Sequence, residues 1–140
     1  MRPAPIASCL AFALLATTLP AGMAGADTPL DAESFERYTT GHTLTFTHDG
    51  VPYGTEQYLP GRRVIWAFMG EDCEEGVWYP RGDMICFEYD TNYIEQCWNF
   101  YRSEDGLRAV FQGPDGPSTE LYEAHRSTTP LMCEGPEVGV

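Results

Sequence analysis

Turn signals recur along most of this chain, and their spacing limits the fold more than any other feature. After Gly41, short runs of alternating polar and apolar residues are separated by segments rich in Gly, Pro, Asp and Asn. These segments come at intervals of roughly 10 residues, which is typical of an antiparallel meander of short strands. The sequence therefore predicts a mainly β domain, and it leaves a small barrel and a sandwich as alternatives.

One short helix is expected before the strands. Asp31 is a suitable N-cap, and Gly41 suits the C-terminal end of a helix. The residues between them predict a helix of about two turns over 32–39, with Phe35 and Tyr38 on its buried side. After Gly41 the period of the pattern changes from that of a helix to that of a strand.

The first 26 residues have the pattern of a cleaved secretory signal peptide. Arg2 supplies a positive charge, residues 6–19 are almost entirely apolar, and Ala24 and Ala26 form an A-x-A cleavage signal. The apolar run is shorter than the roughly 20 residues that a membrane-spanning helix needs. We expect cleavage near Ala26, no lipid on Cys9, and one mature domain over residues 27–140, either periplasmic or secreted.

The charge of the chain argues against two classes of partner. The sequence has 21 acidic residues against eight basic ones, and its formal net charge is −13. Cleavage would remove Arg2 and no acidic residue, which leaves a mature charge of about −14. Because such a field repels phosphate groups, we expect neither nucleic acid nor an anionic membrane surface as a partner. A protein partner or a small ligand fits the composition, and the oligomeric state is open.

Four cysteines follow the predicted cleavage site: Cys73, Cys86, Cys97 and Cys133. An even number of cysteines in a small exported domain indicates disulfides. Structural zinc sites usually need closely spaced pairs, C-x₂₋₄-C, and the gaps here are much longer. There is also no C-x-x-C-H for covalent haem. We therefore expect two disulfides, no metal and no cofactor.

A predicted hairpin decides how the cysteines pair. If Thr91 and Asn92 form the tip of a two-residue turn, residues whose numbers add to 183 lie opposite each other. Cys86 then faces Cys97 at a Cα separation of about 4.5–5.5 Å, which a disulfide accepts. We expect the disulfide Cys86–Cys97, and by exclusion the disulfide Cys73–Cys133.

The same register has consequences on both faces of the hairpin. It pairs a mostly apolar set on the core face: Ile85 with Trp98, Phe87 with Gln96, and Tyr89 with Ile94. It also places Glu88 opposite Glu95, and two like charges in that position repel each other. We expect both carboxylates to be solvated, with a cation site such as calcium as the alternative.

Other residue types that carry chemistry show no recognised pattern. His42, His48 and His125 fall in predicted turns or strand ends, without a G-x-S-x-G signature or another local signature of a hydrolase. The acidic segment 71–75 lacks the spacing of a known calcium loop, so a solvated turn is the expectation. We assign no catalytic residue.

Aromatic and apolar residues define the expected core. The unbroken apolar run 64–69 predicts a central strand that is covered on both faces. Trp66, Trp78 and Trp98 are expected to fill the core, and the alternative is that they line a ligand pocket in a small barrel.

Several segments resemble a group of small exported alphaproteobacterial proteins that has no established function. The residues that carry the resemblance are Tyr53-Gly54-x-Glu56-x-Tyr58-x-Pro60-Gly61-Arg62-Arg63-Val64-x-Trp66, Cys73-x-x-Gly76-x-Trp78-Tyr79-Pro80-x-Gly82-Asp83-x-Ile85-Cys86-Phe87, and Gln96-Cys97-Trp98. The resemblance covers most of the mature chain. It implies an envelope location and a β-rich fold, and it implies no catalytic residues.

These observations lead to one functional expectation and one alternative. We expect a non-enzymatic module that binds either a protein partner or a small apolar ligand outside the cytoplasm. The alternative is a small envelope hydrolase that uses acidic residues which the sequence alone does not place.

Overall fold

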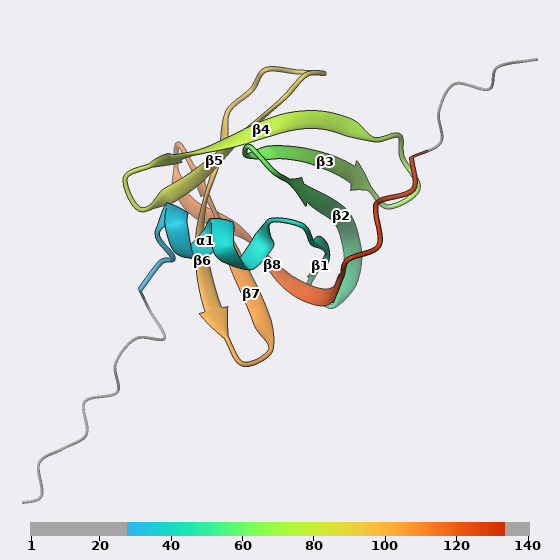
Figure 1. The fold of residues 1–140 in the computed structure, drawn as a ribbon. Helices are drawn as coiled ribbons and strands as arrows, with labels where there is room; N and C mark the ends of the chain where they lie inside the picture. The colour runs from blue at the N-terminus through green and yellow to red at the C-terminus, as the bar shows by residue number, and fades with distance from the viewer. Residues whose placement is uncertain (1–27, 134–140) are drawn as a thin grey trace, which may run out of the picture.

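The structure is a computed structural model that describes residues 28–133 (Figure 1). It contains one helix followed by eight strands: α1 (Ala32–Thr39), β1 (Thr43–His48), β2 (Val51–Leu59), β3 (Arg63–Phe68), β4 (Glu74–Arg81), β5 (Met84–Tyr89), β6 (Gln96–Ser103), β7 (Gly106–Gly113) and β8 (Gly116–Ser127). The predicted signal peptide lies outside the described residues. No helix within 28–133 is long and apolar enough to span a bilayer.

The eight strands form a closed antiparallel barrel in chain order. Each strand pairs with the next, and β1 closes the ring by pairing with β8, with Thr43 opposite Ser127. The first hairpin turns through Asp49 and Gly50, which both have the positive φ angles of a tight two-residue turn. The predicted meander is confirmed, and the barrel is the correct alternative.

Helix α1 lies across one opening of the barrel and closes it (Figure 1). The Asp31 side chain caps the helix by accepting a 2.8 Å hydrogen bond from the Ser34 N–H, as the sequence predicted. Phe35 is fully buried, and its ring contacts four aromatic rings of the barrel at centroid distances of 4.5–6.4 Å: Tyr58, Trp78, Phe87 and Phe100. This end of the barrel is therefore filled by side chains.

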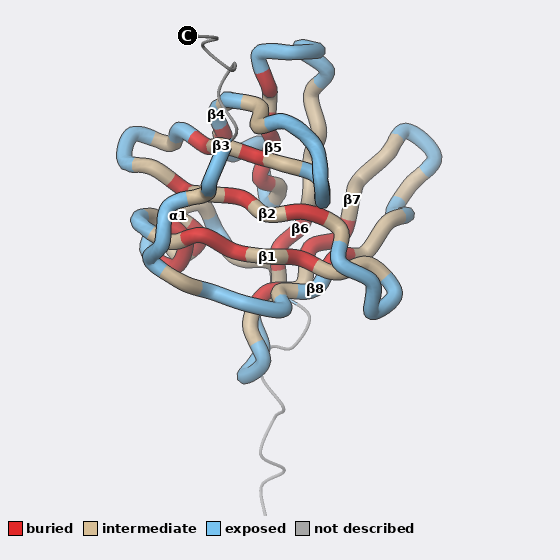
Figure 2. The backbone as a smooth tube through the Cα atoms, turned by 90° about the vertical axis from the view of Figure 1, so that its right-hand side faces the viewer, coloured by how far each residue is buried: buried red, intermediate tan, exposed pale blue. Residues whose placement is uncertain are grey.

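The prediction that the run 64–69 is covered on both faces is wrong. In β3 only Val64 and Trp66 are buried, while Phe68 is 38% exposed and Met69, just beyond the strand, is 55% exposed. A barrel wall has one interior face, so residues of alternate parity point away from the core. Figure 2 shows this alternation of buried and less buried segments along the strands.

The predicted register of β5 and β6 is confirmed, but the predicted tip of this hairpin is wrong. Cys86 lies opposite Cys97, and the two form a disulfide with a Cα separation of 4.0 Å. The ladder stops at Phe87 and Gln96, so residues 90–95 form a longer connection. Beyond Phe87, β5 stays paired with β4 and leaves β6, because the Asp90 N–H donates to the Glu75 carbonyl. Tyr89 therefore does not face Ile94, which is 66% exposed.

The second predicted disulfide, Cys73–Cys133, is also present, with a Cα separation of 5.6 Å. It joins the β3–β4 connection to the segment that follows β8. This segment returns along the barrel wall, where the Leu131 N–H donates a 3.0 Å hydrogen bond to Gln57 Oε1. Two disulfides are typical of a protein that matures in an oxidising compartment outside the cytoplasm.

Candidate functional site

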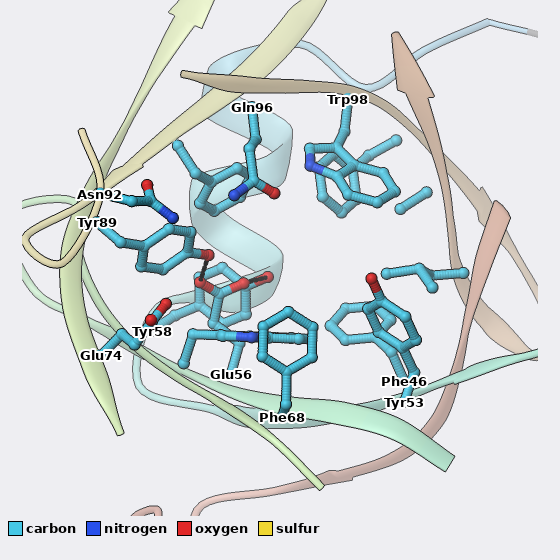
Figure 3. A pocket seen from close by; sticks show the side chains of 15 residues that line it. Phe46, Tyr53, Glu56, Tyr58, Phe68, Glu74, Tyr89, Asn92, Gln96 and Trp98 are labelled. Carbon is cyan, nitrogen blue, oxygen red and sulfur yellow. Dashed lines mark hydrogen bonds between the residues drawn. The ribbon is translucent and has the colours of Figure 1, made fainter. Parts of the chain in front are cut away.

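A cavity of about 130 Å³ lies inside the barrel, at the end opposite α1. Figure 3 looks into it with the helix behind. The side chains that line it come from all eight strands and the 90–95 connection: Phe46, Tyr53, Glu56, Tyr58, Trp66, Phe68, Glu74, Phe87, Tyr89, Asn92, Gln96, Trp98, Phe100, Ala109 and Leu121. Three of the four rings that contact Phe35 also line this cavity, so they separate it from the closed end.

Three aromatic rings from β2 and β3 form one wall of the cavity. The ring of Trp66 lies 6.0 Å from that of Tyr53 and 5.3 Å from that of Phe68, and the Trp66 and Phe68 planes are perpendicular. Gly54 makes this packing possible, because a Cβ atom at that position would lie 2.3 Å from Trp66 Cζ2. The glycine thus lets the indole lie directly against the backbone of β2.

Among the described residues, Glu56 supplies the buried carboxyl group of this cavity. Its side chain points inward from β2, and the residue is only 4% exposed. The Tyr89 hydroxyl donates a 2.7 Å hydrogen bond to Oε1, and the Tyr58 hydroxyl donates a 2.9 Å hydrogen bond to Oε2. Burial raises the pKa of Glu56 to about 7, although the two tyrosine hydrogen bonds lower it.

The polar groups of the cavity are arranged around Trp66. The strand register places Glu56 on one side of Trp66 and Glu74 on the other, all three in one cross-strand row. The Glu74 carboxylate accepts a 2.7 Å hydrogen bond from Thr91 Oγ1. Figure 3 shows the Gln96 amide and the Tyr53 hydroxyl on other sides of the same space. Among the described residues, no arginine, histidine, serine or cysteine lines the cavity.

The three tryptophans all belong to the core or pack against it. Trp78 is 2% exposed and packs against Phe35, and Trp66 is 7% exposed and also belongs to the core. Trp98 is partly buried and packs against the core. The expectation of core filling is therefore confirmed, while Trp66 and Trp98 also line the cavity, and the binding of a ligand there stays a prediction.

The histidines lie outside the cavity. His48 Nδ1 lies 2.8 Å from the Glu120 carbonyl, and His42 Nδ1 lies 3.3 Å from an Arg126 guanidinium nitrogen. His125 sits on β8 and is exposed. None of them lines the space that holds Glu56.

Glu88 and Glu95 do not face each other across a ladder, which corrects the predicted pair. Glu95 belongs to the 90–95 connection, where it forms an ion pair with Arg81 at 2.5 Å. The Tyr79 hydroxyl donates to carboxylate oxygens of both glutamates. The Glu95 carboxylate also lies within 4.8 Å of the sulfur atoms of Cys86 and Cys97, but those atoms form the disulfide. The Arg81 guanidinium supplies a positive charge beside Glu95, and the cation alternative stays a prediction.

Glu56 is the residue of this site that the sequence analysis missed, and the sequence contains a signal for it. Gly54, Glu56 and Tyr58 share one parity on β2, and Tyr58 is a core residue. An acidic residue on the inward parity of a strand stands out, because such positions are normally apolar.

Comparison of this chain with protein-family models, with curated proteins and with solved structures found no match.

Proposed function

We propose that this domain is an exported, non-enzymatic binding protein that holds one small ligand in the open end of its barrel. The main support for this proposal is the cavity, which is lined by aromatic side chains and has a few polar groups directed into it. Ligand sites usually have this composition. Its volume of about 130 Å³ is close to the roughly 150 Å³ of an engineered cavity that binds benzene. The ligand, or the part of it that enters the barrel, is therefore about the size of one ring.

The proposed location is the periplasm or the cell exterior, reached by cleavage of residues 1–26. The A-x-A signal and the apolar run of the sequence support export. The two disulfides agree with it, since they form and persist in oxidising compartments.

Native mass spectrometry of the protein purified from its own envelope fraction tests this proposal. We expect a mass that begins near Asp27, two disulfides, and one bound small molecule that is released on unfolding. A mass that retains residues 1–26 would contradict export. Protein that carries no small molecule and binds none from a library of ring-sized compounds would contradict the binding function.

A pair of matched variants locates the ligand. Ala109 lines the cavity, and Ala67 lies on the outward parity of β3 between Trp66 and Phe68. Ala109→Leu should fill part of the cavity and weaken binding, whereas Ala67→Leu should leave binding unchanged. Binding that is equal in the two variants would place the ligand elsewhere.

A protein partner is the second candidate, and exposed apolar residues favour it. Tyr93 is 76% exposed and Ile94 is 66% exposed, and both follow Asn92, which lines the cavity. The double variant Tyr93→Ser with Ile94→Ser distinguishes the two candidates. It should abolish capture of a protein partner, and it should leave the mass of a small bound ligand unchanged.

A further inference from the structure

The charged side chains that line the cavity, among the described residues, are all acidic. Two carboxyl groups line it, those of Glu56 and Glu74, and among the described residues no basic side chain lines it. Buried charges in proteins are normally paired with an opposite charge. Within the part of the chain that the structure describes, the partners of Glu56 are two tyrosine hydroxyls, and hydroxyls carry no compensating charge.

The hydrogen bonds of Glu56 fix its orientation without using all of its capacity. Each carboxyl oxygen accepts one hydrogen bond from a tyrosine. An ionised carboxylate has about four acceptor positions, so about two of them stay available to a ligand. The two tyrosines thus hold the carboxylate in place beside Trp66, its direct cross-strand neighbour.

The aromatic wall complements a positive charge as well. Tyr53, Trp66 and Phe68 present rings to the cavity, and neighbouring planes meet at 50–90°. Ring faces carry negative potential and attract cations, whereas ring edges are positive, so a cation in this space would contact the faces of the wall. Aromatic cages of this kind are the usual sites for quaternary ammonium groups.

We propose that the ligand of this cavity is a small organic ammonium ion, bound by the aromatic wall and by the Glu56 carboxylate. This inference rests on the proposed function and names the chemical class of the ligand. Glu74, on the other side of Trp66, adds a second negative charge to the same row. The strongly acidic surface adds long-range attraction for such a cation.

Binding should depend on pH through Glu56. The titratable groups that face it are Tyr53 and Tyr58 on β2, Glu74 on β4 and Tyr89 on β5, while the facing residues on β1 and β3 do not titrate. Burial raises the pKa of Glu56 to about 7, so the carboxyl is mostly neutral at pH 6 and mostly charged at pH 8. Affinity for a permanently charged cation should therefore be about tenfold higher at pH 8 than at pH 6.

Two probes of the same shape test the charge requirement. Choline carries a quaternary nitrogen, and 3,3-dimethylbutan-1-ol has a carbon in its place and is neutral. Titration of the mature protein can be followed by tryptophan fluorescence, since Trp66 and Trp98 line the cavity. We expect choline to bind about tenfold more tightly or better than the alcohol at pH 8.

A matched pair of charge variants assigns the effect to the site. Glu56→Gln removes the buried carboxylate, and Glu75→Gln removes an exposed one from the next position after Glu74. Glu56→Gln should remove both the preference for choline and its pH dependence. Glu75→Gln should keep both.

The results of these experiments distinguish a failure of the ammonium-ion inference from a failure of the proposed ligand-binding function. Equal binding of choline and the alcohol would overturn the inference and leave a ligand-binding barrel. Failure of choline to bind, combined with recovery of a neutral or anionic ligand by native mass spectrometry, would also overturn it. Absence of any ligand in both experiments would overturn both statements. If Glu56→Gln still prefers choline over the alcohol, the cation binds without the Glu56 carboxylate, and the inference is overturned.

Discussion

The two ends of this barrel are built from the same strands but differ in what their inward side chains contact. At the closed end, Phe35 of α1 enters the barrel and contacts aromatic rings at 4.5–6.4 Å. At the open end, Tyr53, Trp66 and Phe68 contact one another and leave a cavity. Whether an inward aromatic ring packs against Phe35 or forms the outer wall of the cavity therefore depends on which end of its strand it occupies.

The ends also differ in polarity. The side chains around Phe35 are almost all apolar, and the buried polar atoms of the described residues all have hydrogen-bond partners. The open end holds Glu56, whose burial costs free energy at neutral pH because the charged form loses its hydration. The closed end stabilises the fold, and the open end carries a group that the fold alone would not require.

The largest expected effect is at the closed end. Phe35→Ala should lower the free energy of unfolding by roughly 3–5 kcal/mol, because it removes a fully buried ring and leaves a cavity. Phe68→Ala at the open end should cost about 1 kcal/mol, because this ring is already partly exposed. Urea denaturation of the two variants measures both values. Equal losses would show that the two ends do not differ in this way.

The disulfides give a slightly smaller effect. Replacing Cys73 and Cys133 by alanine opens a loop of 60 residues, and the chain-entropy relation gives a loss of about 4 kcal/mol. The same replacement of Cys86 and Cys97 opens a loop of 11 residues and gives about 3 kcal/mol.

Ligand binding should distinguish the two disulfide variants further. Cys73 directly precedes Glu74, which lines the cavity, whereas Cys86 and Cys97 lie on the outward parity of their strands. The variant without Cys73–Cys133 should therefore lose affinity at the open end, and the other should keep it. Unchanged affinity in both variants would show that this disulfide does not position the cavity rim.

Glu56→Gln should stabilise the protein at pH 8 by up to about 3 kcal/mol. The pKa of Glu56 is about 7 in the folded state and 4.5 as its ordinary value. Between these values the folded state binds more protons, so the stability of the natural protein falls as pH rises from 4.5 to 7. Below pH 4.5 both states are protonated, and the variant should gain nothing from the removed charge.

Urea denaturation of the natural protein and the variant at pH 4 and pH 8 checks this prediction. A gain of the same size at both pH values would mean that packing, and not the charge, is responsible.

A smaller effect on stability than that of Phe35, the disulfides or Glu56 is expected at Gly54. Gly54→Ala places a methyl group against Trp66 and should cost about 2 kcal/mol through overpacking. It should also shift the tryptophan fluorescence, because the indole must move into the cavity. Gly113→Ala is a suitable control, since its nearest neighbour is a Phe111 side-chain atom at 3.2 Å. A larger fluorescence change in the control would contradict the assigned role of Gly54.

Local signals in the sequence predicted much of the fold. The cap at Asp31 placed α1, and the register around Cys86 and Cys97 placed β5 against β6. The tip of that hairpin was missed because β5 leaves β6 to stay with β4, and this is a tertiary preference. The sequence did not distinguish a barrel from a sandwich. The difference is the pairing of β1 with β8, and these two strands come from opposite ends of the domain.

The site was less predictable than the fold. Alternation along β2 identifies the parity of Glu56, but only the closed ring shows that Glu74 and Gln96 reach the same space. The cavity itself depends on how far Phe35 reaches into the barrel. Such a depth follows from packing in three dimensions, and no residue pattern encodes it.

The closing pair of strands also governs the order of assembly. Chains are made from the N-terminus, so β1 is available long before β8, its second partner. Until then one edge of β1 exposes unpaired N–H and C=O groups, which can pair with the edge of another chain. The last strand to arrive therefore completes the ring and removes this hazard. A chaperone that covered the β1 edge would protect the protein at its most aggregation-prone stage.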